Sequence, residues 1–360
     1  QARNDWASTV ETENQSVFYP SVAVSFIPSS AFEGFGGNYL KLRASYGSSA
    51  SFPLPYQTRP VLTSTSNGWI NPYNDAVIAF NSVDSFLPNP DLGSEFLKEY
   101  EIGAEGRFFN NRVSFDLSLY YKTVEDQILF SNLPNSTGYT VTQINAGDVD
   151  TKGIELGLTL TPIQTDNFTW SMNNNFTAYE STVYNIPVDL ISIGSATGGS
   201  GSVINTAING EPFGVFRGTY AVKDDNGNLL IDPSTGKIIF SDNVGLDNAI
   251  IGDPNEDFRL TTINTISWKN LSLSAQLEYV HGGDIYSNTA SNLLRRGVTV
   301  DTEAREGSYI IPGVLGDPAT GVALTDGNGD PIPNNIQIGA NDLYFINLMD
   351  VDENVVYDAS

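Results

Sequence analysis

The sequence predicts an all-β protein, and its pattern favours an antiparallel transmembrane β-barrel with long extracellular loops. Three observations lead to this prediction. Apolar and polar residues alternate strictly over stretches of about ten residues, as they do in strands with one apolar face. Charged residues are confined to one face of these stretches. The connections alternate between tight turns and much longer segments, which is typical of outer-membrane barrels.

Each expected strand is a run in which every second residue is apolar. In 112–121, for example, Leu117 and Leu119 alternate with Asp116 and Ser118. Strands are expected over residues 17–27, 39–47, 99–108, 112–121, 154–160, 168–176, 258–268 and 271–279. Gly, Asn, Ser, Thr and aromatic residues fill much of the chain, a composition that favours strands and turns.

The distribution of charge assigns the two faces of these strands. A charged side chain facing lipid near the middle of the bilayer costs on the order of 2–4 kcal/mol, so the charge-free face is expected to contact lipid. Leu117, Leu158 and Leu273 belong to that face. The lumen-facing residues are expected to include the acidic side chains of the opposite face, namely Glu101, Asp116, Glu155 and Glu278.

The connections are expected to separate by length. Asn110-Asn111 and Lys269-Asn270 are typical of tight hairpin turns. Between the hairpins lie four long segments, 48–98, 124–150, 180–257 and 282–342. Short turns at one end and long loops at the other are a property of outer-membrane barrels.

An extracellular β-sandwich that degrades or binds glycans is the main alternative, because its strands also alternate. Sandwich strands are usually shorter, and their loops are rarely this long. The pattern favours the barrel and leaves the sandwich open. The Glu99 and Glu101 pair could serve as a glycosidase dyad, but alternate positions on one strand more simply line a hydrated lumen. No catalytic residues are therefore assigned, and the chain is not expected to be an enzyme.

Composition excludes several other classes. The 360 residues include 42 acidic and 17 basic ones, for a net charge of −25, which disfavours binding to nucleic acid. There is no cysteine and only one histidine, His281, so sites built from thiolates or several imidazoles are excluded. No apolar run approaches the roughly 18 residues of a transmembrane helix, and no signal peptide opens the chain.

Two kinds of ligand site are considered. The oxygen-rich runs 224–228 and 326–330 resemble calcium loops, but both lack the Glu that an EF-hand requires at its twelfth position. No metal or cofactor is assigned, apart from structural calcium at these runs as an alternative. Aromatic residues among Asn and Ser in 48–98 suit stacking on sugars or holding peptides, and the candidates for ligand binding are Tyr56, Trp69 and Tyr73. The alternative is that these aromatics only pack the loop.

Seven short motifs resemble the barrel region of the SusC/RagA family of TonB-dependent outer-membrane transporters, and they occur in the family's order. The motifs are Asn38-Tyr39-Leu40-Lys41-Leu42-Arg43-Ala44-Ser45-Tyr46-Gly47; Pro88-Asn89-Pro90-Asp91-Leu92 followed by Glu95; Asn145-Ala146-Gly147 with Lys152-Gly153-Ile154-Glu155; Ile251-Gly252-Asp253-Pro254-Asn255 with Asp257-Phe258; Gly282-Gly283-Asp284-Ile285-Tyr286-Ser287; Ile311-Pro312-Gly313-Val314; and Tyr357-Asp358-Ala359-Ser360. Each motif alone is weakly specific, but together they cover nearly the whole chain.

The resemblance implies that residues 1–360 are part of a 22-stranded antiparallel transmembrane β-barrel in the bacterial outer membrane. On this interpretation the chain is a fragment from the C-terminal half of the barrel, without the N-terminal plug, the early strands or the last strands. The implied function is energised, TonB-dependent import of a large nutrient, an oligosaccharide first and a peptide second. The implied partners are a SusD-like surface lipoprotein, outer-membrane lipid, and the TonB complex acting through the plug. A passive porin is the further alternative.

Overall fold

The structure, a computed structural model, describes residues 1–64, 68–78, 80–195, 203–300, 303, 306–339 and 356–358. The chain forms two compact units. The first contains Gln1–Ser192, Ala207–Phe213 and Glu256–His281, and the second contains Ile193–Thr206, Gly214–Asn255 and Gly282–Ser360. Among the described residues, no helix is both long and apolar enough to span a bilayer.

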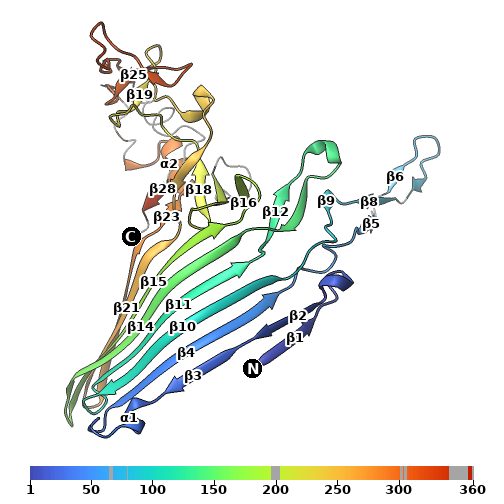
Figure 1. The fold of residues 1–360 in the computed structure, drawn as a ribbon. Coiled ribbons are helices and arrows are strands. Elements are labelled where there is room, and N and C mark those ends of the chain that lie inside the picture. Colours follow the sequence, from blue (N-terminus) through green and yellow to red (C-terminus); the bar gives the residue numbers. More distant parts are fainter. Residues whose placement is uncertain are drawn as a thin grey trace. The chain divides into compact units, whose positions relative to one another are not determined.

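The first unit is dominated by one eight-stranded antiparallel sheet (Figure 1). From edge to edge its strands are β22 (Leu271–Gly282), β21 (Glu256–Trp268), β15 (Phe168–Tyr184), β14 (Asp148–Gln164), β11 (Val113–Glu125), β10 (Glu95–Phe108), β4 (Tyr39–Ser51) and β3 (Val22–Phe26). All eight expected strands are present in this sheet, the first of them only in part, as β3. The prediction of an all-β fold is therefore confirmed.

Most strands are longer than the sequence pattern predicts. β4 extends to Ser51 although the expected strand ended at residue 47, and β14 begins at Asp148 rather than at residue 154. The added residues are largely Ser, Ala, Asp, Thr and Val, which carry little apolar alternation. The backbone ladder nevertheless continues, because β4 pairs with β10 up to Ser51↔Glu95 without a register shift. Hydrogen bonding to a neighbouring strand thus extends each strand beyond its recognisable pattern.

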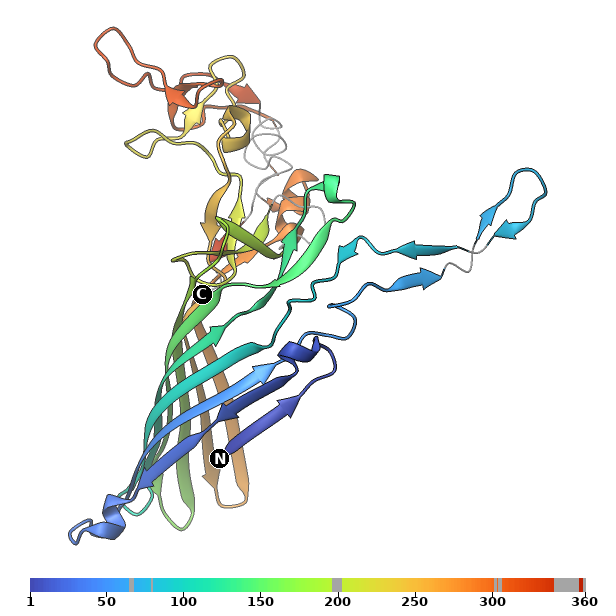
Figure 2. The same cartoon turned by 45° about the vertical axis from the view of Figure 1, so that its right-hand side comes forward.

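The tight turns of this sheet lie together at one end (Figure 2). The β10–β11 turn needs three consecutive non-glycine residues with positive φ, Phe109, Asn110 and Asn111, at 56°, 55° and 63°. Asn tolerates this left-handed conformation better than most residues do. Lys269 adopts φ 52° in the β21–β22 turn. Both predicted hairpins are confirmed.

The longer connections of the first unit contain short ordered elements. They comprise β1 (Ala2–Trp6), η1 (Thr12–Asn14), β2 (Ser16–Pro20), α1 (Pro28–Ala31), β5 (Leu62–Ser64), β6 (Trp69–Ile70), β7 (Val77–Ile78), β8 (Asn81–Val83), β9 (Phe86–Leu87), β12 (Ile128–Asn132), η2 (Asn135–Thr137) and β13 (Val141–Asn145). β5 pairs with β8 and β6 with β7, so the described residues of 62–83 (62–64, 68–78 and 80–83) form two antiparallel strand pairs, together called the arm. The segment 48–98 is therefore not an unstructured loop.

The second unit contains shorter strands. Its elements are β18 (Val215–Gly218), β19 (Leu230–Ile231), η3 (Ser241–Val244), β20 (Ala249–Gly252), β23 (Asp284–Tyr286), α2 (Asn288–Arg295), β24 (Ser308–Tyr309), β25 (Val314–Asp317), β26 (Val322–Ala323), β27 (Ile338–Gly339) and β28 (Val356–Asp358). Two further strands, β16 (Leu190–Ser195) and β17 (Ile204–Ile208), form a four-stranded sheet with β18 and β20. The parallel pair β19 and β25 lies at the centre of a small β-region, residues 220–244 and 309–338, which has its own apolar core.

Candidate functional site on the polar face of the sheet

The register places three of the four predicted lumen carboxylates in one region of one sheet face. Asp116 on β11 pairs with Glu105 on β10 and with Gly157 on β14. Glu101 lies on the same face four residues from Glu105, and Glu155 lies on it two residues from Gly157. Glu278 on β22 is bound by Arg259 of β21, which continues that face. The assignment of this face to a barrel lumen remains a prediction, but the structure does bring the side chains to a common surface.

Arg43 is the centre of this polar face. Its Nε donates a hydrogen bond to Glu101 Oε1 at 2.9 Å, and its Nη2 donates to Asp116 Oδ1 at 2.7 Å and to Ser118 Oγ at 2.6 Å. Ser118 Oγ in turn donates to Glu101 Oε1 at 3.1 Å. The side chains of Arg43 and Glu101 are 26% and 27% exposed, so this network is partly shielded from water. One guanidinium therefore joins three strands, β4, β10 and β11.

This reach depends on Gly103. Arg43 pairs directly with Gly103 of β10, and the guanidinium crosses that glycine to reach β11. A Cβ at position 103 would lie 2.6 Å from Arg43 Nε and 2.8 Å from the backbone oxygen of Leu117. Those distances are too short for any real side chain, so glycine is required where the arginine passes.

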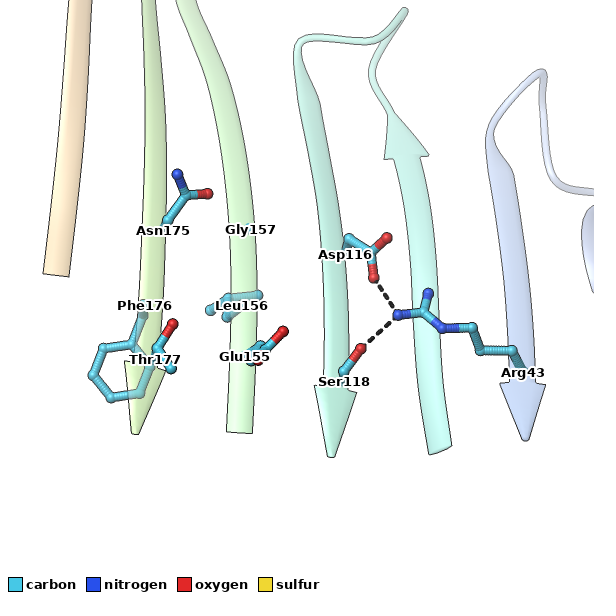
Figure 3. A pocket seen from close by; sticks show the side chains of 9 residues that line it. All are labelled: Arg43, Asp116, Ser118, Glu155, Leu156, Gly157, Asn175, Phe176 and Thr177. Carbon is cyan, nitrogen blue, oxygen red and sulfur yellow. Dashed lines mark hydrogen bonds and ion pairs between the residues drawn. The ribbon is translucent and has the colours of Figure 1, made fainter. Parts of the chain in front are cut away.

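Two adjoining grooves run along the same face. The first has a volume of about 370 Å³ and is lined by Arg43, Asp116, Ser118, Glu155, Leu156, Gly157, Asn175, Phe176 and Thr177 (Figure 3). The second, of about 260 Å³, shares Asp116, Gly157 and Asn175 with the first. Glycine at 157 leaves β14 without a side chain between the two. The walls are mostly polar, which suits contact with a hydrated solute or a polar protein surface.

A second ion-pair cluster lies further along the sheet. Arg259 Nη2 is 2.7 Å from Glu256 Oε2, and Arg259 also contacts Glu278 across the β21–β22 pair. Thr265 and Ser274 share a hydrogen bond of 3.2 Å between these strands. The polar face therefore continues to the edge strand.

The opposite face of the sheet is apolar and largely uncovered. Ile102, Leu273 and Leu277 are 59%, 67% and 66% exposed, far above what a water-soluble sheet tolerates in its core face. On β10 the charge-free stretch runs from Tyr100 to Phe108, about 26 Å at roughly 3.3 Å per residue. At a strand tilt of about 35–45°, that length spans roughly 18–21 Å of the bilayer normal, most of the apolar band of about 25 Å on outer-membrane barrels.

Charged residues return to this apolar face beyond one end of the band. Lys98 Nζ lies 2.5 Å from Glu125 Oε2, and Lys152 pairs in register with Glu180. All four residues lie toward the end with the longer connections. They mark where the apolar face stops.

Three uncharged polar residues interrupt the apolar face, which the sequence pattern did not predict. Asn174 pairs with Thr262, and Asn264 lies two residues along β21. Asn174 Nδ2 donates to Leu158 O at 3.2 Å, and Asn264 Nδ2 donates to Thr262 Oγ1 at 3.1 Å. Trp170 Nε1 donates to Asn264 Oδ1 at 3.2 Å. Hydrogen bonding to one another and to the backbone lowers the cost of placing these side chains on an apolar surface.

The three aromatic residues predicted to bind ligand do not form one group. Tyr56 follows β4 and lines a separate pocket with Arg59. Trp69 lies in β6 and Tyr73 in the following turn, so both belong to the arm formed by 62–83. They are 55% and 96% exposed, and ligand binding by any of the three remains a prediction.

The two predicted calcium loops are hairpin turns that their own aspartates close. Asp224 Oδ1 accepts hydrogen bonds from the backbone of Asn226 and Asn228, at 2.9 and 2.8 Å. Asp326 Oδ1 accepts equivalent bonds from Asn328 and Asp330, at 2.8 and 3.1 Å. Within the described part of the chain, no group of three or more His, Cys, Asp or Glu residues is placed to hold a metal ion. Calcium at these turns therefore stays a prediction.

Sequence reasoning missed Arg43, Gly103 and Gly157 as functional-face residues. Arg43 carried a signal, because it was the one arginine of its expected strand and lay on the charged face. The two glycines gave no such signal. The sequence alone does not show whether a glycine within a strand allows the strand to bend or leaves room for a side chain from a neighbouring strand. Their roles depend on which strands are neighbours.

Comparisons with known proteins bear on these observations. Residues 1–311 match the model of the family described as TonB dependent receptor-like, beta-barrel. The chain is 30% identical over 306 residues to TonB-dependent receptor P26 of Formosa agariphila, an alignment that covers 79% of this chain and 30% of that protein. It is 24% identical over 238 residues to TonB-dependent receptor SusC of Bacteroides thetaiotaomicron, covering 61% of this chain and 22% of SusC.

The fold is similar to solved structures of the same kind. The structure titled RagAB peptide transporter matches with a TM-score of 0.66 and 21% identity, over 83% of this chain and 33% of that one. The RagAB peptide importer in the open-open state matches with a TM-score of 0.62. The matches span about a fifth to a third of the length of these proteins.

A sheet with one polar and one apolar face is what the wall of an outer-membrane barrel requires. The family match and the relatives also confirm the predicted resemblance. The chain belongs to the TonB-dependent receptor-like β-barrel family.

Proposed function

We propose that the protein containing this chain imports a large nutrient across the outer membrane in a TonB-dependent manner. The observation that carries the proposal is that one continuous sheet has a charge-free apolar band on one face and charged grooves on the other. Such a wall separates lipid from a hydrated passage. The chain's membership of the TonB-dependent receptor-like family supplies the energised mechanism.

In this proposal the polar face serves as the inner wall against which the moving part of the transporter packs. Hydrogen-bonded charges such as Arg43, Glu101 and Asp116 are already partnered within the wall. Because these side chains already bond one another, they form a rigid polar surface to which a plug would bind only weakly and from which it could move away. A TonB complex would act on that plug, and the nutrient would be an oligosaccharide or, as the second candidate, a peptide.

Uptake by the source bacterium tests this proposal. A strain lacking the gene is complemented with the full-length gene and supplied separately with oligosaccharide and peptide mixtures. Growth or uptake restored only when TonB and the proton-motive force are intact supports import. Uptake that persists without TonB would instead favour a passive porin. Glycan hydrolysis by the purified protein would contradict the proposal of a transport function.

We also propose that a SusD-like surface lipoprotein covers the extracellular end. The support is the arm formed by 62–83, whose apolar side chains are uncovered: Leu62, Trp69, Ile70, Tyr73, Val77 and Val83 are each more than half exposed. A two-stranded hairpin of this kind is marginally stable in water by itself. A protein partner would stabilise it by burying those side chains.

Deletion of each long segment from the full-length protein tests the lipoprotein contact. The segments are 48–98, 180–257 and 282–342, each replaced by a short Gly-Ser linker, and the measurement is co-purification of the lipoprotein. Loss in at least one deletion that still inserts into the membrane supports the proposal. Retention in all three deletions places the contact elsewhere.

A further inference from the structure

Two amide side chains lie on the apolar face of the sheet, and the proposed transport function gives them no role. Asn174 of β15 is opposite Leu158 of β14, and Asn264 of β21 is opposite Met172 of β15. Both side chains are only partly buried, so a neighbouring molecule can reach them. Together with Thr262, which pairs in register with Asn174, they are called the amide patch.

The amide patch lies near the middle of the apolar face. On β15 this face begins at Phe168 and ends where Glu180 pairs in register with Lys152, and Asn174 is six residues from Phe168 and from Glu180. At roughly 3.3 Å per residue, that is about 20 Å of strand on either side. At a tilt of about 35–45° this becomes roughly 14–16 Å along the bilayer normal. Acyl chains surround a barrel at that depth, and they offer no hydrogen bonds.

Much of the hydrogen-bonding capacity of the amide patch is unused. An asparagine side chain has two amide hydrogens and a carbonyl oxygen with two lone pairs. Among the described residues, Asn174 donates one hydrogen bond, to Leu158 O at 3.2 Å, and its carbonyl oxygen accepts none. Asn264 donates once, to Thr262, and accepts once, from Trp170 Nε1 at 3.2 Å. Water would complete these bonds at a wet surface, but in lipid a second membrane-spanning protein must do so.

The residues beside the amide patch leave it accessible to another protein surface. Hydrogen bonds between β21 and β22 on the polar face set the register of this pair, which puts Ala275 opposite Asn264. Ala275 is the smallest side chain on the apolar face of β22, with Leu273 and Leu277 on either side of it along the strand. A partner can therefore come closer to Asn264 than it could if leucine stood at position 275.

We propose that the amide patch is the contact through which two copies of this protein associate within the membrane. The inference rests on the proposed function only for the placement of the apolar face in lipid. An amide is its own complement, because the free amide hydrogen of one copy can be donated to the free carbonyl oxygen of the other. Around a two-fold axis that bond is made twice, by the same surface of both copies. Polar side chains hold membrane-spanning segments together in this way.

The distribution of charge favours a second copy as the occupant. The chain has a net charge of −25, so most of its polar surface would repel another copy. The apolar face of β15 has no charged residue from Phe168 to Ala178, and that of β21 has none from Phe258 to Trp268. Two copies can therefore meet at the amide patch without placing like charges opposite one another.

Disulfide crosslinking of the full-length protein in lipid vesicles locates the contact. Met172→Cys introduces a thiol beside the amide patch, in a protein whose other cysteines, if any, are replaced by serine, and a lipid-soluble oxidant is added. Ala104→Cys is the matched control, because position 104 lies on the same face of the sheet but three strands away, on β10. We expect an intermolecular disulfide at position 172 and none at position 104. No disulfide at 172, or equal yields at the two positions, would overturn the inference.

Energy transfer between donor- and acceptor-labelled copies measures the strength of association as the vesicles are diluted with lipid. Replacing both amides, with Asn174→Leu and Asn264→Leu, should weaken association about tenfold. Asn173→Leu is the control, because Asn173 is the neighbouring residue of the same strand and belongs to the polar face. It should leave association unchanged. Equal association of the wild type and the double variant would place the contact elsewhere and contradict the inference.

Insertion and uptake are measured on the same proteins, so this inference can fail by itself. A wild-type protein that resists protease in vesicles and supports TonB-dependent uptake, but shows no energy transfer at any dilution, contradicts the association and leaves the proposed function standing. A wild-type protein that does not insert into vesicles contradicts both, because the apolar face would then not lie in lipid.

Discussion

The eight-stranded sheet and the small β-region of 220–244 and 309–338 use apolar residues in opposite ways. In the small β-region Leu230, Ile231 and Ile239 are at most 1% exposed and pack into two apolar clusters. In the sheet, Ile102 and Leu273 remain more than half exposed. Both regions use Leu and Ile side chains, so the difference in exposure indicates that the two regions face different surroundings. The small β-region follows the rule for water, and the sheet follows the rule for lipid.

The comparison predicts that the largest loss of stability follows when a buried side chain of the small β-region is shortened and leaves a cavity. Leu230→Ala should destabilise this region by about 2–5 kcal/mol, because the side chain is fully buried in a packed cluster. Hydrogen exchange measured on the full-length protein should show faster exchange of the amides of Val222, Leu230 and Ile239, which bond one another across the region. Val322→Ala, at a residue 62% exposed, is the control and should change little. Unchanged exchange in Leu230→Ala would mean that this core does not hold the region together.

A charge on the outer face of the sheet should have the next largest effect. Leu117→Arg should destabilise the full-length barrel by about 2–4 kcal/mol, because the guanidinium would face lipid near the middle of the charge-free band. Ser114→Arg places the same side chain on the polar face and should cost less. Urea titration of refolding into lipid vesicles measures both. If the two variants are equally stable, the two faces do not differ in solvent and the barrel assignment is wrong.

A smaller effect is expected where Arg43 crosses β10. Gly103→Ala should displace the guanidinium and break its bonds to Asp116 and Ser118, at a cost of about 1–2 kcal/mol. Gly47→Ala is the matched control, since no atom lies within 4 Å of the Cβ it would add. The same urea titration applies. Equal stability of the two variants would show that the crossing contributes nothing.

The smallest effect concerns pH and the small β-region alone. Hydrogen bonds from Asn228 hold the pKa of Asp224 below its ordinary value, and backbone amides of Asn328 and Asp330 do the same for the pKa of Asp326. A carboxyl whose folded pKa is lowered stabilises the fold above its unfolded pKa, about 3.9, and loses that contribution as the pH falls through the folded value. Both turns should therefore be insensitive to pH between about 7 and 5.

Hydrogen exchange, corrected for the intrinsic effect of pH, measures this response. Protection at Asn226 and Asn228 should fall below about pH 4, and Asp224→Asn should flatten the response. The large sheet contains no comparable turn among its hairpins, so its protection should not follow the same curve. A pH response that survives in Asp224→Asn would assign the effect to another group.

The two regions also differ in how much could be predicted. The strands of the sheet were expected from alternation, because neighbouring residues on a strand point to opposite faces whatever the strand pairs with. The small β-region was left inside two long segments, 180–257 and 282–342. Its central pair joins Leu230 to Val314, residues distant in sequence, and its strands are only two to four residues long. Strands this short contain no detectable period.

The sequence by itself determined the strand faces, the hairpins at Asn110-Asn111 and Lys269-Asn270, and the family. Each depends on residues close together in the chain or on motif order. Only the tertiary structure decided that Arg43 crosses Gly103 to reach Asp116, and that Tyr56 shares a pocket with Thr9 and Arg59. It also separated Tyr56 from Trp69 and Tyr73, which the sequence had grouped. Those relations depend on strand order and loop anchoring, which arise from backbone pairing between distant segments and leave no mark on local residue patterns.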